Sequence, residues 1–283
     1  MVTNEKNLVS SDELTQQAWP LRRVGLKVYD LPSILDYYTR LGLSIVRDDR
    51  NEGAEGTTGT VGMGVDGKEI LSLRVLPGGR PRPARTAGLY HFAILLPNEA
   101  ELGSFLRHCI ELRIPIDGAS DHLVSQALYL SDPEGNGIEV YADRPRSEWE
   151  WSGSDIKMAT LPLNAQALLK QAGAFEGFSA QTKLGHMHLN VGNLDASLAF
   201  YQKLGMNLTA DLFNSARFLS WDGYHHHLGI NVWAGRNARR VEPDVYGIDF
   251  FELSRPGLQT GTFVDPDGVQ VVITENEPMD VSA

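Results

Sequence analysis

The sequence contains one cysteine, Cys109, so no disulfide can form within the chain. Small domains that fold in oxidising compartments commonly depend on disulfides, and a lone thiol therefore indicates a reducing context. We expect a cytoplasmic protein. Cys109 lies in a segment with helical spacing of its apolar residues, residues 102–112, and is expected to be a buried packing residue.

Long apolar runs and basic stretches are also missing. No apolar run approaches the roughly 20 residues that span a membrane, and residues 1–20 lack the apolar core of a signal peptide. The formal net charge is −11 and the basic residues form no stripe, which argues against a nucleic-acid partner. The composition is that of a globular protein, and the charge favours a neutral or weakly acidic small-molecule substrate.

What the sequence does contain is a repeat. Residues 23–28 and 186–191 are both short alternating strands, and each is followed by an aspartate and a helix that carries an aromatic pair. The pairs are Tyr37-Tyr38 and Phe200-Tyr201, and both helices end at Leu-Gly. Glycine after the last helical turn is a common stop signal. The sequence therefore predicts two copies of one strand–helix–strand unit.

A second pair of segments shares a different signature. Residues 132–135 and 265–268 both read Asp-Pro-x-Gly, a tight-turn sequence, and both lie between alternating strands. Little room for a helix remains between residues 253 and 262, so this last copy is short. We divide the chain into four modules, at about 21–77, 88–145, 184–234 and 246–275, and predict an α+β architecture. The corresponding division is an N-terminal half at residues 1–147, a linker at residues 148–183 that contains a helix, and a C-terminal half at residues 184–283.

Four stretches of sequence resemble the vicinal oxygen chelate superfamily, and most closely its extradiol catechol dioxygenases: residues 88–93, 121–125, 127–139 and 223–227. The resemblance implies βαβββ modules that pair into two half-barrel cups, the fourth module being shortened. It also implies an enzyme that uses Fe(II), or alternatively Mn(II), and O2 to open a catechol ring to a hydroxy-semialdehyde.

The candidate metal ligands are His91, Glu139 and His186. Two histidines and one carboxylate on one face of the ion are typical of oxygen-activating iron. His91 and His186 stand at the start of a module's first strand, and strand alternation separates each candidate ligand from its apolar neighbours. A carboxylate in the otherwise apolar strand around Glu139 is costly unless it is paired or bound to metal.

The other module positions do not offer ligands. Where module three has His186, module one has Arg23. Where module two has His91 and Glu139, module four has a residue at or near Asp249 and Val272. A complete set therefore forms only if modules two and three share one cup, which leaves modules one and four to form a cup without metal. Exchange of modules within a homo-oligomer, which we expect the protein to form, would bring the same residues together.

Three further residues are candidate catalytic groups. Tyr129 precedes Glu139 by the spacing of the family's catalytic tyrosine, and His122 matches its polar residue near the substrate hydroxyl. Within residues 225–227, the family resemblance selects His226 as the acid/base, whereas simple strand alternation selects His225 and His227. Two other functions stay open: a glyoxalase-like isomerase or lyase, which typically needs a second carboxylate ligand, and a metal-free small-molecule binding protein of the same fold.

Overall fold

The computed structural model describes residues 19–53, 56–153 and 155–275. The segment for which we expected no signal peptide lies outside these residues, except for its last two positions. None of the helices in the described part of the chain is long and apolar enough to cross a membrane.

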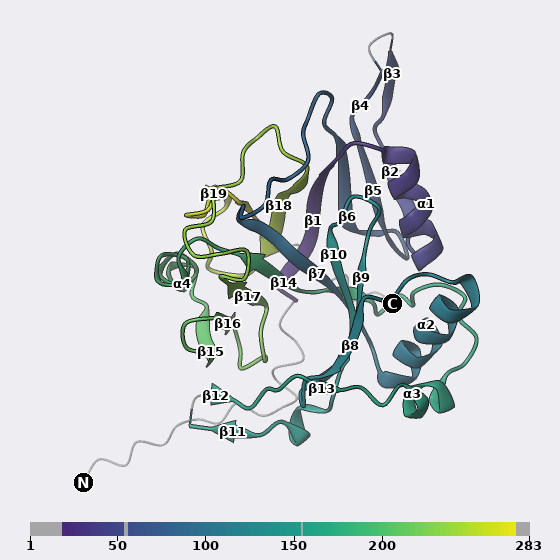
Figure 1. Ribbon diagram of the computed structural model, residues 1–283, viewed down its shortest axis with the longest axis vertical. Helices are drawn as coiled ribbons and strands as arrows, with labels where there is room; N and C mark the ends of the chain where they lie inside the picture. The colour runs from purple at the N-terminus through teal and green to yellow at the C-terminus, as the bar shows by residue number, and fades with distance from the viewer. Residues whose placement is uncertain (1–18, 54–55, 154, 276–283) are drawn as a thin grey trace.

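One sheet joins the beginning of the chain to its end (Figure 1). Its central strand β1 (Leu21–Val28) lies parallel to β6 on one side and antiparallel to β18 on the other. The seven strands, in order, are β19 (Gly261–Val264), β20 (Gln270–Thr274), β18 (Gly247–Ser254), β1, β6 (Lys68–Val75), β5 (Thr60–Val65) and β2 (Ser44–Asp48).

The middle of the chain forms a second, nine-stranded sheet, which curves into a half-barrel. Its central strand, β7, lies antiparallel to β14, which comes from a distant part of the sequence. The order is β13 (Leu161–Pro162), β8 (Gly118–Asp121), β9 (Ser125–Ser131), β10 (Gly137–Asp143), β7 (Gly88–Leu96), β14 (Lys183–Asn190), β17 (Leu228–Asn231), β16 (Ala216–Ser220) and β15 (Asn207–Asp211). Two short hairpins complete the strands: β3 (Asn51–Gly53) with β4 (Gly56–Thr58), and β11 (Trp151–Ser152) with β12 (Asp155–Ile156).

Each α-helix begins at a polar cap that the sequence supplies. The side chains of Asp30, Asn98, Asn164 and Asn193 accept hydrogen bonds from backbone N–H groups of the first turn, which otherwise lack partners. The helices are α1 (Leu31–Leu41), α2 (Glu99–Leu112), α3 (Ala165–Gln171) and α4 (Leu194–Lys203). One continuous core contains residues from all four helices and from both sheets, and Cys109 is fully buried within it, as expected.

The aromatic pairs and the Asp-Pro-x-Gly turns, two separate signatures in the sequence, meet in the structure. The hydroxyl of Tyr38 in α1 donates a hydrogen bond of 3.0 Å to the carboxylate of Asp132. Tyr201 in α4 makes the same contact with Asp265, at 2.8 Å. Each helix is thus fastened to a turn that lies far along the chain, and all four side chains are buried.

The α+β class with mixed sheets is confirmed, and between β18 and β19 the structure has no helix, as the short spacing predicted. The count of four modules remains an interpretation of the repeat. The proposed division into residues 1–147, 148–183 and 184–283 stays a prediction, although each sheet takes strands from both sides of the middle segment.

Candidate metal centre and cavity

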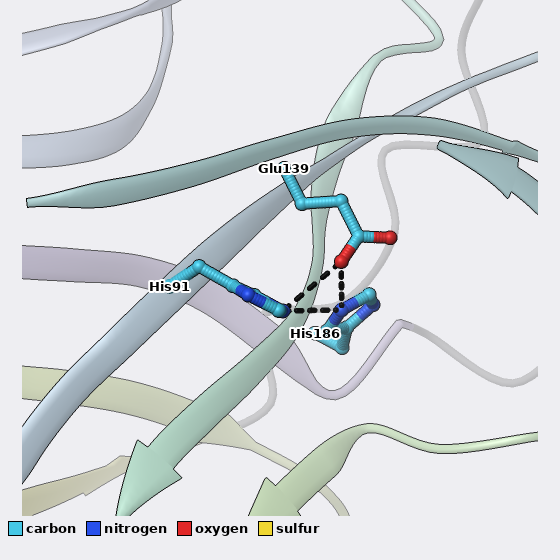
Figure 2. A group of neighbouring side chains, drawn as sticks. All are labelled: His91, Glu139 and His186. Carbon is cyan, nitrogen blue, oxygen red and sulfur yellow. Dashed lines mark hydrogen bonds and ion pairs between the residues drawn. The ribbon is translucent and has the colours of Figure 1, made fainter. Parts of the chain in front are cut away.

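The three predicted ligands lie on three neighbouring strands of the nine-stranded sheet. His91 is on β7, Glu139 on β10 and His186 on β14, with β7 in the middle (Figure 2). Glu139 and His186 both pair in register with Ala93, from opposite sides. Since paired residues of a sheet project to the same face, the two ligands flank the small Ala93 side chain, and His91 follows two positions away on that same face.

The pairing between β7 and β14 is interrupted on both sides of the ligands. Gly185 on β14 has no partner on β7, and Tyr90 on β7 has no partner on β14. Between these two bulges, residues 186–188 pair one position out of register with the rest of the strand. Such bulges bend and twist a sheet, so they curve this one around the ligands. Gly185 cannot carry a larger side chain, since a Cβ there would collide with the hydroxyl of Tyr141.

The donor atoms of the ligands converge. The Nε2 atom of His91 lies 3.0 Å from the Oε2 atom of Glu139, His186 Nε2 lies 3.2 Å from the same oxygen, and the two nitrogens are 3.3 Å apart. Donors at right angles around one ion, each at about 2.1 Å, would be separated by roughly 3.0 Å. All three side chains are at most 5% exposed. The residues therefore fit a divalent ion and form a buried metal-binding site.

The charges of this cluster favour a cation. Burial raises the pKa of Glu139, but the imidazoles of His186 and His91 outweigh this effect and hold that pKa well below 4.5. Burial lowers the pKa of His186 to about 4, with the neighbouring His91 adding to the shift. A carboxylate at Glu139 and a neutral imidazole at His186 are the protonation states that metal binding requires of these ligands. His186 Nδ1 is buried without a hydrogen-bond partner, so packing against the rings of Tyr141 and His226 orients this side chain.

Tyr129 and His122 form a hydrogen-bonded pair next to the metal site. His122 Nδ1 lies 2.7 Å from the carbonyl oxygen of Ala159, so this nitrogen carries the proton and donates. In the neutral ring, Nε2 is then the acceptor, and the Tyr129 hydroxyl, at 2.6 Å, donates to it. Burial and the charge of Glu139 raise the pKa of Tyr129. The structure thus brings both predicted residues together, and the ring of Tyr129 lies between those of His122 and His91 in the chain of contacts.

The run of three histidines points in different directions. His226 lines the cavity and its ring centroid lies 4.2 Å from that of His186. His227 instead packs between Trp221 and Tyr224 and accepts a hydrogen bond from the backbone of Trp221. Strand alternation does not apply to this segment, because residues 225–227 precede β17 and are not part of a strand, and the acid/base role within the run stays a prediction.

His225 links His226 to a carboxylate. Its Nε2 atom lies 2.8 Å from Asp143 Oδ1, and its Nδ1 atom lies 2.7 Å from His226 Nδ1. A carboxylate accepts, so His225 donates from Nε2 and accepts at Nδ1. His226 must then donate from Nδ1, which leaves its Nε2 as a free acceptor. Burial, with the neighbouring His186 and His225, lowers the pKa of His226 well below 6.5.

A cavity of about 470 Å³ opens above the cluster and is lined by His91, Glu139, Tyr129, His122 and His226. Sequence reasoning missed much of its wall. His188 received no role, and neither did Tyr90, Val124 and Ser125, although these three lie in stretches that resemble the family. The other side chains come from segments that no motif marks. These additional lining residues are Tyr90, Ser120, Val124, Ser125, Met158, Ala159, Thr160, Leu212, Phe218 and Trp233.

Comparison with known proteins agrees with this geometry. Residues 21–140 match the model of the Glyoxalase/Bleomycin resistance protein/Dioxygenase superfamily. Over 198 residues the chain is 46% identical to a catechol-2,3-dioxygenase of Bacillus subtilis, which covers 68% of this chain and 69% of that protein.

Solved structures share the fold at low sequence identity. The CppA protein of Streptococcus pneumoniae superposes with a TM-score of 0.57 at 14% identity, over 91% of this chain and 99% of that one. Glyoxalase I of Zea mays superposes with a TM-score of 0.51 at 18% identity, over 93% and 95% of the two chains. The chain therefore belongs to the glyoxalase/bleomycin resistance protein/dioxygenase superfamily, and within it is a homologue of the Bacillus subtilis catechol-2,3-dioxygenase.

Proposed function

We propose that the protein is an extradiol dioxygenase, which cleaves the ring of a catechol beside its two hydroxyl groups and adds both atoms of O2 to give a hydroxy-semialdehyde. The observation that carries this proposal is the buried set of two histidines and one carboxylate at the floor of a cavity. Such a set binds one face of an ion and leaves the other face open to substrates. The homology to a catechol-2,3-dioxygenase supports the same activity.

We further propose that the ion is Fe(II), with Mn(II) as the alternative, and that His91, Glu139 and His186 hold it. Imidazole and carboxylate ligands suit either metal. When bound, the ion would supply a Lewis acid for the diol and a path for electrons between diol and O2. Among the described residues no second carboxylate joins this cluster, which disfavours a glyoxalase-like isomerase or lyase. A metal-free binding protein would have no need of the converging ligands.

The remaining residues would handle protons and orientation. The Tyr129 hydroxyl, fixed by His122, is placed to hydrogen-bond a catechol oxygen at the cavity floor. His226 would take up a proton at its free Nε2 and later return it, as a general base and then a general acid. Asp143 and His225 would keep its ring in the tautomer that this role requires.

Reconstitution tests the proposal directly. The purified protein is loaded with Fe(II) or Mn(II) without air, metal content is measured, and a panel of catechols is added in oxygenated buffer. We expect equal consumption of O2 and catechol with a new absorbance from the ring-opened product. Full metal occupancy with no O2 uptake on any catechol would exclude the dioxygenase function.

We also propose the architecture that the repeat implies. Four modules would pair as two with three and one with four, so that one half-barrel cup holds metal and a second does not. Arg23 supports this view, because it replaces a ligand in the seven-stranded sheet and forms ion pairs with Glu69 and Glu252. The division at residues 147 and 184, the homo-oligomer and the cytoplasmic location remain proposals from the sequence.

A further inference from the structure

The cavity above the ligands is divided into a polar floor and an apolar outer wall. Its volume is about 470 Å³, which exceeds the space that a single catechol ring with its two oxygens would fill. Cavities of this size commonly enclose ligands of two or more rings. Space therefore remains beyond the ring that the ligands would hold.

The outer wall is built of aromatic rings in contact with one another. The ring of Tyr90 lies 5.0 Å from that of Trp233 and 5.1 Å from that of His188, and His188 lies 5.2 Å from Trp233 and 5.7 Å from Phe218. Three of these four contacts are edge-to-face, one of the arrangements that aromatic groups prefer. The wall reaches the floor, since Tyr90 also contacts His91 and Phe218 contacts His226.

The rim of the cavity exposes apolar side chains that a ligand could cover. Trp233 is 49% exposed and Leu212 47% exposed, and both line the cavity. Exposed apolar groups that gather at a concave site are typical of ligand-binding surfaces.

The wall offers no counter-ion for an anionic substituent. Among the described lining residues Glu139 is the one with a formal charge, and none is a lysine or arginine. A carboxylate transferred into such surroundings would lose its hydration without gaining a partner. The net charge of −11 works in the same direction.

We propose that the preferred substrate is an uncharged catechol that carries a bulky apolar, preferably aromatic, substituent, which packs against Tyr90, Phe218 and Trp233. This inference rests on the proposed function and specifies its substrate class. Unsubstituted catechol leaves the outer space unfilled, and catechols with a carboxylate arm are disfavoured.

The test compares catechol, 3- and 4-phenylcatechol and 3,4-dihydroxyphenylacetate on the Fe(II)-loaded enzyme. O2 uptake gives kcat/KM, and quenching of tryptophan fluorescence without air gives the dissociation constants. For the better phenylcatechol we expect a kcat/KM and an affinity about tenfold or more above those of catechol. The dihydroxyphenylacetate should be the poorest substrate. An equal or better response to catechol, or a preference for the carboxylated compound, would overturn the proposal.

Two tryptophan variants locate the effect. Trp233→Ala should lower kcat/KM for phenylcatechol by about tenfold, mainly through KM, and should lower that for catechol much less. Trp151→Ala is the matched control, because Trp151 is similarly exposed, at 48%, but does not line the cavity. Equal losses in both variants would contradict the assignment of the wall.

The affinities separate a failure of the substrate preference from a failure of the proposed function. If no compound is turned over but the affinities follow the expected order, the dioxygenase function fails and the binding preference stands. If the affinities do not follow that order, the binding preference fails as well.

Discussion

Ala93 is the residue that allows three ligands on three strands to meet. Its register partners on the two sides are Glu139 and His186, and it is fully buried between them. A methyl group fills the space beneath the converging donor atoms without pushing them apart. Ala93 lies in the family-like stretch 88–93, but the sequence gives it no role, because its importance arises only when strands from distant parts of the chain pair.

We predict that Ala93→Val weakens metal binding by tenfold or more while the protein stays folded, since overpacking displaces neighbouring side chains. Ala142→Val is the control: Ala142 is equally buried but packs in the large core, away from the ligands. Metal affinity is measured by anaerobic titration and folding by circular dichroism. Equal affinities in the two variants would show that the space under the ligands does not matter.

The histidine run gives a second prediction at this scale. His226→Phe should retain Fe(II) but lose turnover by roughly 10²–10⁴-fold, the usual effect of removing a positioned acid/base. His227→Phe should be much less affected, because that ring faces Trp221 and Tyr224 instead of the cavity. His225→Phe should fall between them, since His225 holds His226 in place. A large loss in His227→Phe with normal His226→Phe would reverse the assignment.

The sequence predicted the metal ligands, but it did not decide between the three neighbouring histidines or reveal the cavity wall. His91, Glu139 and His186 could be found because each occupies a repeated position in a regular strand, where alternation fixes the direction of a side chain. The choice within residues 225–227 could not be made that way, because they lie in an irregular segment. Wall residues such as Met158 and Trp233 come from connections whose path depends on tertiary packing.

At the scale of the elements, the paired tyrosine and aspartate side chains hold helices to distant turns. Sequence reasoning found the aromatic pairs, the helix-ending glycines and the turns, because these signals are local. It could not reveal that Tyr38 reaches Asp132 or that Tyr201 reaches Asp265, because these contacts depend on how the modules pack.

Asp265 gives a prediction on pH. Burial raises its pKa from 3.8 to about 6, an effect that the hydrogen bond from Tyr201 only partly offsets. The folded protein thus holds this proton more tightly than the unfolded chain. The resulting contribution to the free energy of unfolding is fully present below about pH 4 and is lost as the pH rises through about 6.

We therefore compare the free energy of unfolding of the wild type with that of the Asp265→Asn variant. The wild-type value minus the variant value should fall by about 2 kcal/mol between pH 4 and pH 7. Urea unfolding of the metal-free proteins at several pH values measures this difference. Taking the difference cancels the other titrating groups that both proteins share. A difference that stays constant across the range would mean that Asp265 titrates alike in the folded and unfolded chains.

At the scale of the whole molecule, the two sheets interlock the two halves of the chain. His91 and Glu139 come from the first half and His186 from the second, so a bound ion connects them. The repeat allowed this arrangement to be inferred, since only one pairing of modules unites the ligands. The extra residues at Gly185 and Tyr90, which curve the sheet there, could not be foreseen from strand periodicity.

Metal should therefore stabilise the molecule as a whole. At a free Fe(II) concentration of about 100 times the dissociation constant, binding adds about 2.7 kcal/mol, which for a chain of this size raises Tm by roughly 4–5 °C. Anaerobic calorimetry measures the shift. Glu139→Gln should abolish most of it, because an amide is a poor substitute for the carboxylate ligand. A shift of the same size in that variant would place the ion elsewhere.

The pairing of β1 with β18 has a consequence for the order in which the protein matures on the ribosome. The nine-stranded sheet contains its last strand, β17, once residue 231 has been made. Among the described strands β1 is synthesised first, yet one of its two neighbours, β18, begins only at Gly247. A strand with one open edge must therefore wait until β18 has been made, and such an edge invites pairing with other chains. The part that holds the metal ligands can assemble early, whereas the sheet without them closes last.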